Sequence, residues 1–350
     1  MIYSLILALA GLILSIVISV IVFPFVIRSS LASGMTTVDA HKKGKPIIAE
    51  PGGLATILAF TFSFLAIIVV IVIIRNLIDE EFIQLTEFDI EFGNINEDLP
   101  KYLGGILAVV IAGLIGLIDD IFGRSVRWRE KIFLGFLPSF PLIILGINNP
   151  IRGIEIGILY AVFIIPLGMN FAFNSYNMLA GYNGLETGLG IISFTTILIV
   201  SIWVNDPTVL IFAACMLGAL LVLFWYNKYP AKVLIGNSGT LMLGAALFVV
   251  IILGNLESLA LGIFLLYFIN FVMFFFYLRD PRAFKSEGEK IKLADIDDEE
   301  NLIPPSPWAV YWIIPFYRKN TKEYTNVMFL LILQTIICGI TIFGFFLMNP

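Results

Sequence analysis

The run NVMFLLILQTIICGITIFGFFL, residues 326–347, contains no charged residue and is long enough to cross a lipid bilayer as one helix. The composition of the whole chain agrees with this run, because 59% of its 350 residues are hydrophobic and only 13% are charged. A soluble domain would carry about 25% charged residues. The sequence therefore predicts a polytopic protein whose solvent includes the lipid bilayer.

Similar apolar runs recur along the chain and predict an all-α membrane protein with about ten transmembrane helices. The predicted spans are residues 2–27, 53–74, 102–118, 132–147, 154–172, 185–204, 208–226, 239–254, 257–277 and 326–347. Pro138, Pro141 and Pro166 interrupt the fourth and fifth spans, and membrane helices tolerate such prolines where neighbours satisfy the freed backbone groups. We expect a single membrane-embedded domain over residues 1–350.

The basic residues are divided unequally between two alternating sets of loops. Eighteen of the 21 Lys and Arg residues fall in the loops 28–52, 119–131, 173–184, 227–238 and 278–325. The other set holds only Arg75, Lys101 and Arg152. Because cytoplasmic loops are enriched in Lys and Arg, the first set is predicted to be cytoplasmic, with both termini outside. Within the cytoplasmic loop 278–325, the aromatic and proline-rich stretch near 302–316 predicts an interfacial or re-entrant element.

Two acidic residues stand at the predicted cytoplasmic end of the third span. Asp119 and Asp120 directly follow an apolar run, where carboxylates are costly unless they are hydrated, paired or bound to a cation. The alternative is a pair of solvated helix-end residues. The string VRWREK follows, and its Arg127, Arg129 and Lys131 indicate either an interfacial anchor or a cluster that binds phosphate.

The string NSYNMLAGYNGLE, residues 174–186, lies between two apolar runs and contains three asparagines. Asn174 and Asn177 are three positions apart and would share one face of a helix. Carboxamides can ligate a hard cation through oxygen and can hydrogen-bond the edge of a nucleobase. A capped polar turn is the alternative, but such a turn seldom needs so many polar residues together.

Two further polar strings lead straight into apolar spans. GNSGT at residues 236–240 would place free N–H groups and the positive end of a helix dipole where phosphate oxygens bind well. Asn and Ser are also ordinary N-cap residues, so this string alone is a weak signal. Glu50 opens the second span in a similar way and is preceded by Asp39 and Lys42.

With these strings in this order, the chain resembles the polyprenyl-phosphate N-acetylhexosamine-1-phosphate transferases. It is most similar to the eukaryotic and archaeal branch that uses dolichyl phosphate and UDP-N-acetylglucosamine. The resemblance runs from Asp39 to about Arg282, and its most specific part is NSYNMLAGYNGLE, similar to the branch's N-x-x-N-x-x-A-G-x-N-G-L-E. It implies a catalytic domain that transfers N-acetylglucosamine 1-phosphate from UDP-N-acetylglucosamine to polyprenyl phosphate, on the cytoplasmic face, with release of UMP. Nucleic acid is not among the expected partners.

The resemblance also assigns roles to individual residues. Asp119 and Asp120 match the family's catalytic aspartate pair. Mg²⁺, with Mn²⁺ as the alternative, is the expected cofactor, and its expected ligands are Asp120, Asn177 and Asn237. The residues expected to bind the substrates are Asp39, Lys42, Glu50, Lys131, Asn183, Glu186 and Arg282.

Two positions depart from the family pattern. Asn237 stands where the family usually has a metal-binding aspartate, so either the substrate diphosphate holds more of the metal or the site is impaired. Many relatives also carry an Arg-His-Arg cluster in the last cytoplasmic loop, where this chain has Pro281-Arg282-Ala283-Phe284-Lys285. His41 is the only histidine and is expected to be a solvated loop residue.

A rival hypothesis is a membrane transporter of a small solute, and a catalytically weak homologue is a third. Transporters place polar residues near the bilayer midplane, whereas the polar strings here fall at span ends. The Lys- and Ile-rich, cysteine-poor composition favours an archaeal plasma membrane over an endoplasmic reticulum membrane. The oligomeric state stays open, with a homodimer among the options.

Overall fold

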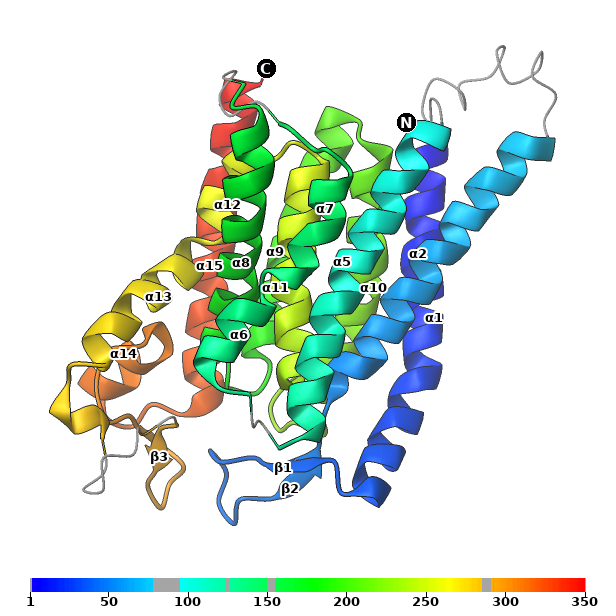
Figure 1. The fold of residues 1–350 in the computed structure, drawn as a ribbon. Coiled ribbons are helices and arrows are strands. Elements are labelled where there is room, and N and C mark those ends of the chain that lie inside the picture. Colours follow the sequence, from blue (N-terminus) through cyan, green and yellow to red (C-terminus); the bar gives the residue numbers. More distant parts are fainter. Residues whose placement is uncertain are drawn as a thin grey trace.

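A computed structural model describes residues 2–77, 95–123, 126–149, 155–284, 291 and 293–349 of the chain. Within these residues the protein is a bundle of helices that run roughly side by side (Figure 1). Seven of the described helices are long and apolar enough to cross a membrane, and one bent pair of helices is an eighth candidate. The fold is therefore that of a multi-pass helical membrane protein.

The helices differ in length, and the strands are short. The seven long helices are α1 (Ile2–Ser33), α2 (Gly52–Leu77), α5 (Ile95–Ile121), α9 (Leu185–Val204), α10 (Pro207–Asn227), α11 (Gly236–Leu253) and α15 (Glu323–Met348). The shorter elements are α6 (Trp128–Leu134), η1 (Leu137–Ser139), α7 (Phe140–Ile144), η2 (Tyr160–Ile164), α8 (Ile165–Met178), α12 (Glu257–Ile263), α13 (Leu265–Tyr277), η3 (Pro281–Ala283) and α14 (Val310–Tyr317). Two antiparallel pairs join β1 (Thr36–Val38) to β2 (Ile47–Ala49) and β3 (Asp295–Ile296) to β4 (Leu302–Ile303).

Three of the ten predicted spans are not single regular helices. The fourth is divided among α6, η1 and α7, and Pro138 and Pro141 lie in the first turns of η1 and α7. Proline lacks the N–H that would continue the preceding helix, which explains both breaks. The fifth span begins as the π-helical η2 and continues as α8, while its first residue, 154, lies outside the described residues. The ninth is bent by 58° between α12 and α13.

Helix α11 lies at the centre of the bundle, and every residue from Gly236 to Ile252 is buried. Helices α2, α5, α8 and α10 all pack against it. The approach of α5 depends on Gly116, because a Cβ atom there would lie 2.3 Å from the carbonyl oxygen of Asn237. This close contact brings the C-terminal end of α5 against the first turn of α11.

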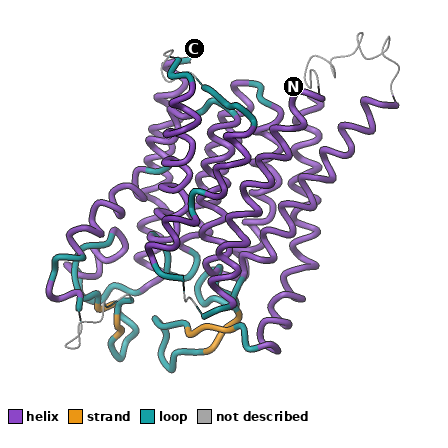
Figure 2. Tube along the Cα trace, viewed as in Figure 1, coloured by secondary structure: helices purple, strands orange, loops and turns teal. Residues whose placement is uncertain are grey.

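The two ends of the bundle have different structures. Figure 1 shows the N- and C-termini at one end and the β1–β2 hairpin at the other, near the C-terminal end of α5. Figure 2 shows that the β-strands gather at this second end, which we call the strand end. Residues 302–316 lie there as β4, a connecting loop and most of α14. Whether this segment is re-entrant in a bilayer stays a prediction.

Candidate active site

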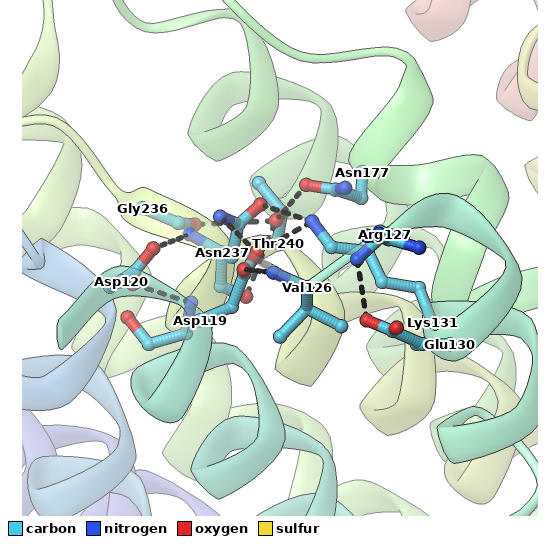
Figure 3. A network of polar contacts seen from close by, with 11 residues as sticks. Asp119, Asp120, Val126, Arg127, Glu130, Lys131, Asn177, Gly236, Asn237 and Thr240 are labelled. Atoms are coloured by element: carbon cyan, nitrogen blue, oxygen red, sulfur yellow. Dashed lines mark hydrogen bonds and ion pairs between the residues drawn. The ribbon is translucent and has the colours of Figure 1, made fainter. Parts of the chain in front are cut away.

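Asp119 lies near the C-terminal end of α5 and is 1% exposed. Its Oδ1 atom accepts a hydrogen bond from the backbone N–H of Val126 at 2.9 Å. Its Oδ2 atom accepts one from Asn237 Nδ2 at 2.9 Å and forms an ion pair with Lys131 Nζ at 2.6 Å (Figure 3). A buried carboxylate needs such partners, because burial without them costs much free energy. These contacts join α5, α6 and α11.

Lys131 is placed by the way α6 begins. The backbone N–H of Arg127 donates to the Glu130 carboxylate at 2.8 Å, which caps the first turn of the helix. The next residue, Lys131, then points toward Asp119 and lies 3.5 Å from Asn237 Oδ1 (Figure 3). The string VRWREK thus contains both the residues that cap the start of α6 and the lysine that pairs with Asp119.

Asp120 contacts the start of α11. Its two carboxylate oxygens accept the backbone N–H groups of Asn237 and Ser238, at 2.8 and 2.9 Å. The first N–H groups of a helix have no partner within the helix, and the helix dipole favours negative charge there. Gly236 makes the approach feasible, since its φ is +71° and a Cβ atom would lie 2.6 Å from Asp120 Oδ2. The sequence did not predict this anchoring role for Asp120.

Asn177, in the last turn of α8, completes the first group of polar side chains. Its Oδ1 atom accepts a hydrogen bond from the hydroxyl group of Thr240 at 2.7 Å. Figure 3 shows the Asn177 amide directed toward Thr240, in the middle of the drawn network. Asn174, which the sequence placed on the same helix face, instead donates to Asn170 within α8 at 3.0 and 3.1 Å. We call Asp119, Lys131, Asn177 and Asn237 the central cluster.

The central cluster contains oxygen donors that suit a hard divalent cation. Among the described residues, no group of three or more His, Cys, Asp or Glu side chains gathers to hold a metal. Asp119 supplies one carboxylate, and Asn177 and Asn237 supply neutral amide oxygens. Mg²⁺ commonly uses one or two carboxylates together with water and substrate phosphates, so this donor set fits a cation that shares its ligands with a phosphorylated substrate.

A second group of predicted residues lies in two loops at the strand end, the loop after β1 and the loop between α8 and α9. Asn183 Nδ2 donates to Asp39 Oδ2 at 2.9 Å, and Lys42 Nζ lies 3.5 Å from Asp39 Oδ1. The same Lys42 forms a close ion pair with Glu323 at the start of α15. All four side chains are buried. The structure therefore brings together Asp39, Lys42 and Asn183, which the sequence predicted as site residues. It adds Glu323, which the sequence did not predict.

The expectation that His41 is solvated was wrong. Its side chain is 3% exposed and packs edge-on against the ring of Tyr182, with the ring centroids 4.8 Å apart. Burial, together with the nearby ammonium group of Lys42, lowers the pKa of His41 to about 4. The imidazole is therefore neutral at pH 7. The physical reason for the burial is that the loop after β1 packs against the residues around Tyr182 and Asn183.

The loop between α8 and α9 is held by hydrogen bonds to its backbone. Glu186 Oε1 accepts the N–H of Gly181 at 2.5 Å. Asn227 Oδ1 accepts the N–H of Gly184 at 3.2 Å, while Asn227 Nδ2 donates to the carbonyl oxygen of Val233 at 3.0 Å. The sequence missed Asn227, because it lies at the end of an apolar helix outside the polar strings. This side chain links the asparagine-rich loop to the segment that enters α11.

Like Glu186, the predicted substrate-binding residues Glu50 and Arg282 are not members of either group. Glu50 is buried at the end of β2, next to Ala49, whose carbonyl oxygen accepts the N–H of Leu234 at 3.0 Å. Arg282 is more exposed and forms an ion pair with Asp280 at 2.7 Å, and this contact lowers the pKa of Asp280. Among the described residues, no hydrogen bond or ion pair connects Arg282 with the central cluster.

An open, mostly apolar surface hollow of about 440 Å³ lies along α6 and Val126. Its lining residues are Val126, Arg129, Glu130, Phe133 and Leu134. Val126 connects the hollow to the site, because it lines the hollow and its N–H donates to Asp119. The arrangement places apolar surface, a cationic side chain and a paired carboxylate next to one another.

Comparisons with known proteins identify relatives of this chain. The sequence model of glycosyl transferase family 4 matches residues 102–255, which include the whole central cluster. A phospho-N-acetylmuramoyl-pentapeptide-transferase of Staphylococcus aureus is 31% identical over 225 residues, which cover 58% of this chain and 69% of that protein. The UDP-N-acetylglucosamine–dolichyl-phosphate N-acetylglucosaminephosphotransferase of Saccharomyces cerevisiae is 26% identical over 334 residues, 86% of this chain and 70% of the yeast protein. A Saccharolobus solfataricus protein provisionally given the same name is 29% identical over 271 residues, covering 74% and 75% of the two chains.

Proposed function

This chain belongs to glycosyl transferase family 4, and on that premise we propose that it transfers N-acetylglucosamine 1-phosphate from UDP-N-acetylglucosamine to a dolichyl-type polyprenyl phosphate. UMP is the second product. The observation that supports this most strongly is the convergence of Asp119, Lys131, Asn177 and Asn237 at one end of a membrane bundle. A lipid phosphate and a soluble nucleotide can meet only at such a surface.

The reaction requires little acid–base chemistry from the protein. An oxygen of the lipid phosphate forms a bond to the β-phosphorus of the donor, and the bond from that phosphorus to the bridging oxygen breaks. UMP leaves with the electron pair. The second pKa of a phosphomonoester is about 6, so the attacking group is already largely a dianion at pH 7. Positioning and charge neutralisation should therefore dominate the rate.

Lys131 is the group best placed to neutralise phosphate charge. Its ammonium group is held 2.6 Å from Asp119 Oδ2, and the Lys131 side chain is more exposed than that of Asp119, at 16% against 1%. Asp119 keeps the ammonium group in place, while the Lys131 N–H groups that do not face Asp119 can bind phosphate oxygens. Asp120 contributes indirectly, because it fixes the first turn of α11 and with it the position of Asn237.

Mg²⁺ is the cofactor that suits this donor set, and Mn²⁺ suits the same oxygens. Asp119, Asn177 and Asn237 would hold it together with phosphate oxygens of the donor. When bound, it would neutralise negative charge on the diphosphate. The two neutral amides leave much of that binding to the substrate, as Asn237 in place of an aspartate already indicated.

The orientation proposed from the sequence places the strand end in the cytoplasm. Two observations support it: both termini lie at the opposite end, and the C-terminal end of α5, which carries Asp119, lies at the strand end (Figure 1). In this proposal, α6 with α7 and η2 with α8 provide the two crossings that complete ten. The hollow beside Val126 would receive the first apolar part of the lipid, and an archaeal plasma membrane is the proposed location.

The direct test is to incubate the purified protein with UDP-N-acetylglucosamine, polyprenyl phosphate and Mg²⁺. We expect metal-dependent release of UMP together with a lipid-linked sugar diphosphate. A matched control replaces Lys101, which pairs with Asp98 at the far end of the bundle, by alanine and should keep full activity. Absence of UMP under every metal tested would refute the proposed function.

A further inference from the structure

Four buried side chains at the strand end close a ring of polar contacts. Glu323 Oε1 accepts the backbone N–H of Asn183 at 2.6 Å, and Glu323 Oε2 forms a close ion pair with Lys42. Lys42 Nζ lies 3.5 Å from Asp39 Oδ1, and Asn183 Nδ2 donates to Asp39 Oδ2 at 2.9 Å. We call these residues the peripheral ring. It joins the loop after β1, the loop between α8 and α9, and the first turn of α15.

Within the peripheral ring, Glu323 holds both Lys42 and the backbone of Asn183 in place. One ammonium group faces two carboxylates, and each residue is at most 7% exposed. A buried ion pair is sensitive to loss of one partner, because the remaining charge is then uncompensated. Lys42 also lies over the ring of Tyr229, 4.1 Å from its centroid, which restricts the ammonium group further. Glu323 is the only one of the four that contacts both Lys42 and the backbone of the asparagine-rich loop.

The position of Glu323 in its helix is not sufficient to explain its burial. An acidic residue in a first turn is favoured by the helix dipole, but a solvated one would serve equally well. Here the carboxylate is 2% exposed, and both of its oxygens are directed to other segments. Its contacts lie with residues 140 and 281 positions away in the sequence. The side chain therefore fixes two loops relative to each other.

We propose that Glu323 is a positioning residue for binding of the sugar nucleotide. It sets the place of Lys42 and of the backbone at Asn183, in two loops whose residues the resemblance expects to bind the substrates, and it acts through those loops. This inference rests on the proposed function, because it assigns the peripheral ring to the donor and the central cluster to the transferred phosphate. A change at Glu323 should accordingly affect binding of the donor more than the chemical step.

The variant Glu323→Gln tests this inference with the least disturbance of packing. Glutamine keeps the size and an oxygen that can accept the Asn183 N–H, but it loses the charge that holds Lys42. We expect KM for UDP-N-acetylglucosamine to rise roughly tenfold, with kcat and KM for polyprenyl phosphate changed less than about twofold. A fall in kcat at unchanged donor KM would overturn the proposal.

A matched control separates positioning from a general structural role. Glu257, in the first turn of α12, also joins distant segments, because its carboxylate accepts hydrogen bonds from Asn149 at 2.7 Å and from Tyr160. It lies at the end of α11 opposite the strand end. Glu257→Gln should lower the melting temperature without changing the donor KM. Equal changes of KM in both variants would show a merely structural role for Glu323.

A double variant tests whether Glu323 acts through Lys42. If it does, Glu323→Gln combined with Lys42→Met should raise the donor KM no more than Lys42→Met alone. Multiplicative effects would contradict this coupling. Should Glu323→Gln fail to fold, Glu323→Asp provides the same test, because it keeps the charge but retracts the carboxylate. Its donor KM should rise by a smaller factor, and an unchanged KM would overturn the proposal.

A binding measurement distinguishes failure of the inference from failure of the proposed function. UDP-N-acetylglucosamine should raise the melting temperature of the unmodified protein, and the concentration required should be roughly tenfold higher for Glu323→Gln. If the unmodified protein is neither stabilised by this nucleotide nor active with it, the proposed function is wrong. If it is both, and Glu323→Gln needs the same nucleotide concentration, only the inference is wrong.

Discussion

The central cluster and the peripheral ring each contain a lysine paired with a buried carboxylate, but the two lysines differ in their surroundings. Lys131 is 16% exposed and has Asp119 as its only carboxylate partner among the described residues. The Lys42 side chain is 8% exposed and lies between Asp39 and Glu323. The Lys131 side chain is therefore the more accessible to a ligand, whereas the Lys42 ammonium group is held between two carboxylates. We therefore expect the Lys131–Asp119 pair to contribute to catalysis, and the Lys42 ion pairs to hold loops in position.

The largest expected effect comes from Lys131→Ala. Loss of the exposed ammonium group should lower kcat by about 10²- to 10³-fold, because an electrostatic contact to the transferred phosphate is removed. Measurements of UMP release with Lys101→Ala as control would reveal it. A drop of less than threefold would mean that Lys131 does not contact the reacting phosphate, and the contrast between the two lysines would disappear.

Lys42→Met should lower stability in addition to raising the donor KM. Removing the enclosed ammonium group leaves Asp39 and Glu323 uncompensated, and breaking a buried pair in this way costs about 3 kcal/mol or more. Thermal unfolding in detergent checks this, with the exposed neighbour Lys43→Met as control. If both variants melt at the same temperature, the peripheral ring does not stabilise the fold.

Asn237→Asp tests whether the metal ion contacts position 237. A carboxylate at this position adds negative charge beside Asp119, whose Oδ2 atom now accepts the Asn237 amide at 2.9 Å. The Mg²⁺ concentration for half-maximal activity should fall by about tenfold, or about 1.4 kcal/mol, and Mn²⁺ binding to the nucleotide-free protein should become stronger. An unchanged Mg²⁺ requirement would mean that the metal does not touch this position.

The smallest expected effect concerns pH. The pKa of His41 is about 4 in the folded protein and about 6.5 when unfolded, so below pH 6.5 the unfolded chain takes up a proton that the folded one lacks. Stability should therefore fall with falling pH, by about 0.8 kcal/mol between pH 7.5 and 6. His41→Gln should show a shallower fall over this range in thermal unfolding. Parallel profiles for both proteins would contradict the burial of His41.

The central cluster could be predicted from the sequence because its members stand at the ends of apolar helices. Asp119, Asn177 and Asn237 each lie within a polar string next to a span, and the alternation of spans brings those strings to one end of the bundle. The contacts themselves could not be predicted. The metal role expected for Asp120 stays a prediction, but its hydrogen bonds to the N–H groups of α11 were not foreseen, because they depend on the close packing of α5 on α11.

Glu323 shows where sequence reasoning ends. It is separated from Lys42 by 281 positions, and as an acidic residue at a helix start it has an ordinary local explanation. The helix breaks at Pro138 and Pro141 within the fourth predicted span were likewise not predicted. The apolar run there is long enough to cross a membrane, but the prolines divide it into short helices, which length and hydropathy alone do not reveal.

The most direct test of the account uses UDP-N-acetylglucosamine labelled with ³²P in its β-phosphate. Attack of the lipid phosphate at the β-phosphorus beside Lys131 predicts that the label moves with the sugar into the lipid product and that UMP carries none. Recovery of the label in UDP, with only the sugar attached to lipid, would contradict the central claim that this protein transfers a sugar phosphate.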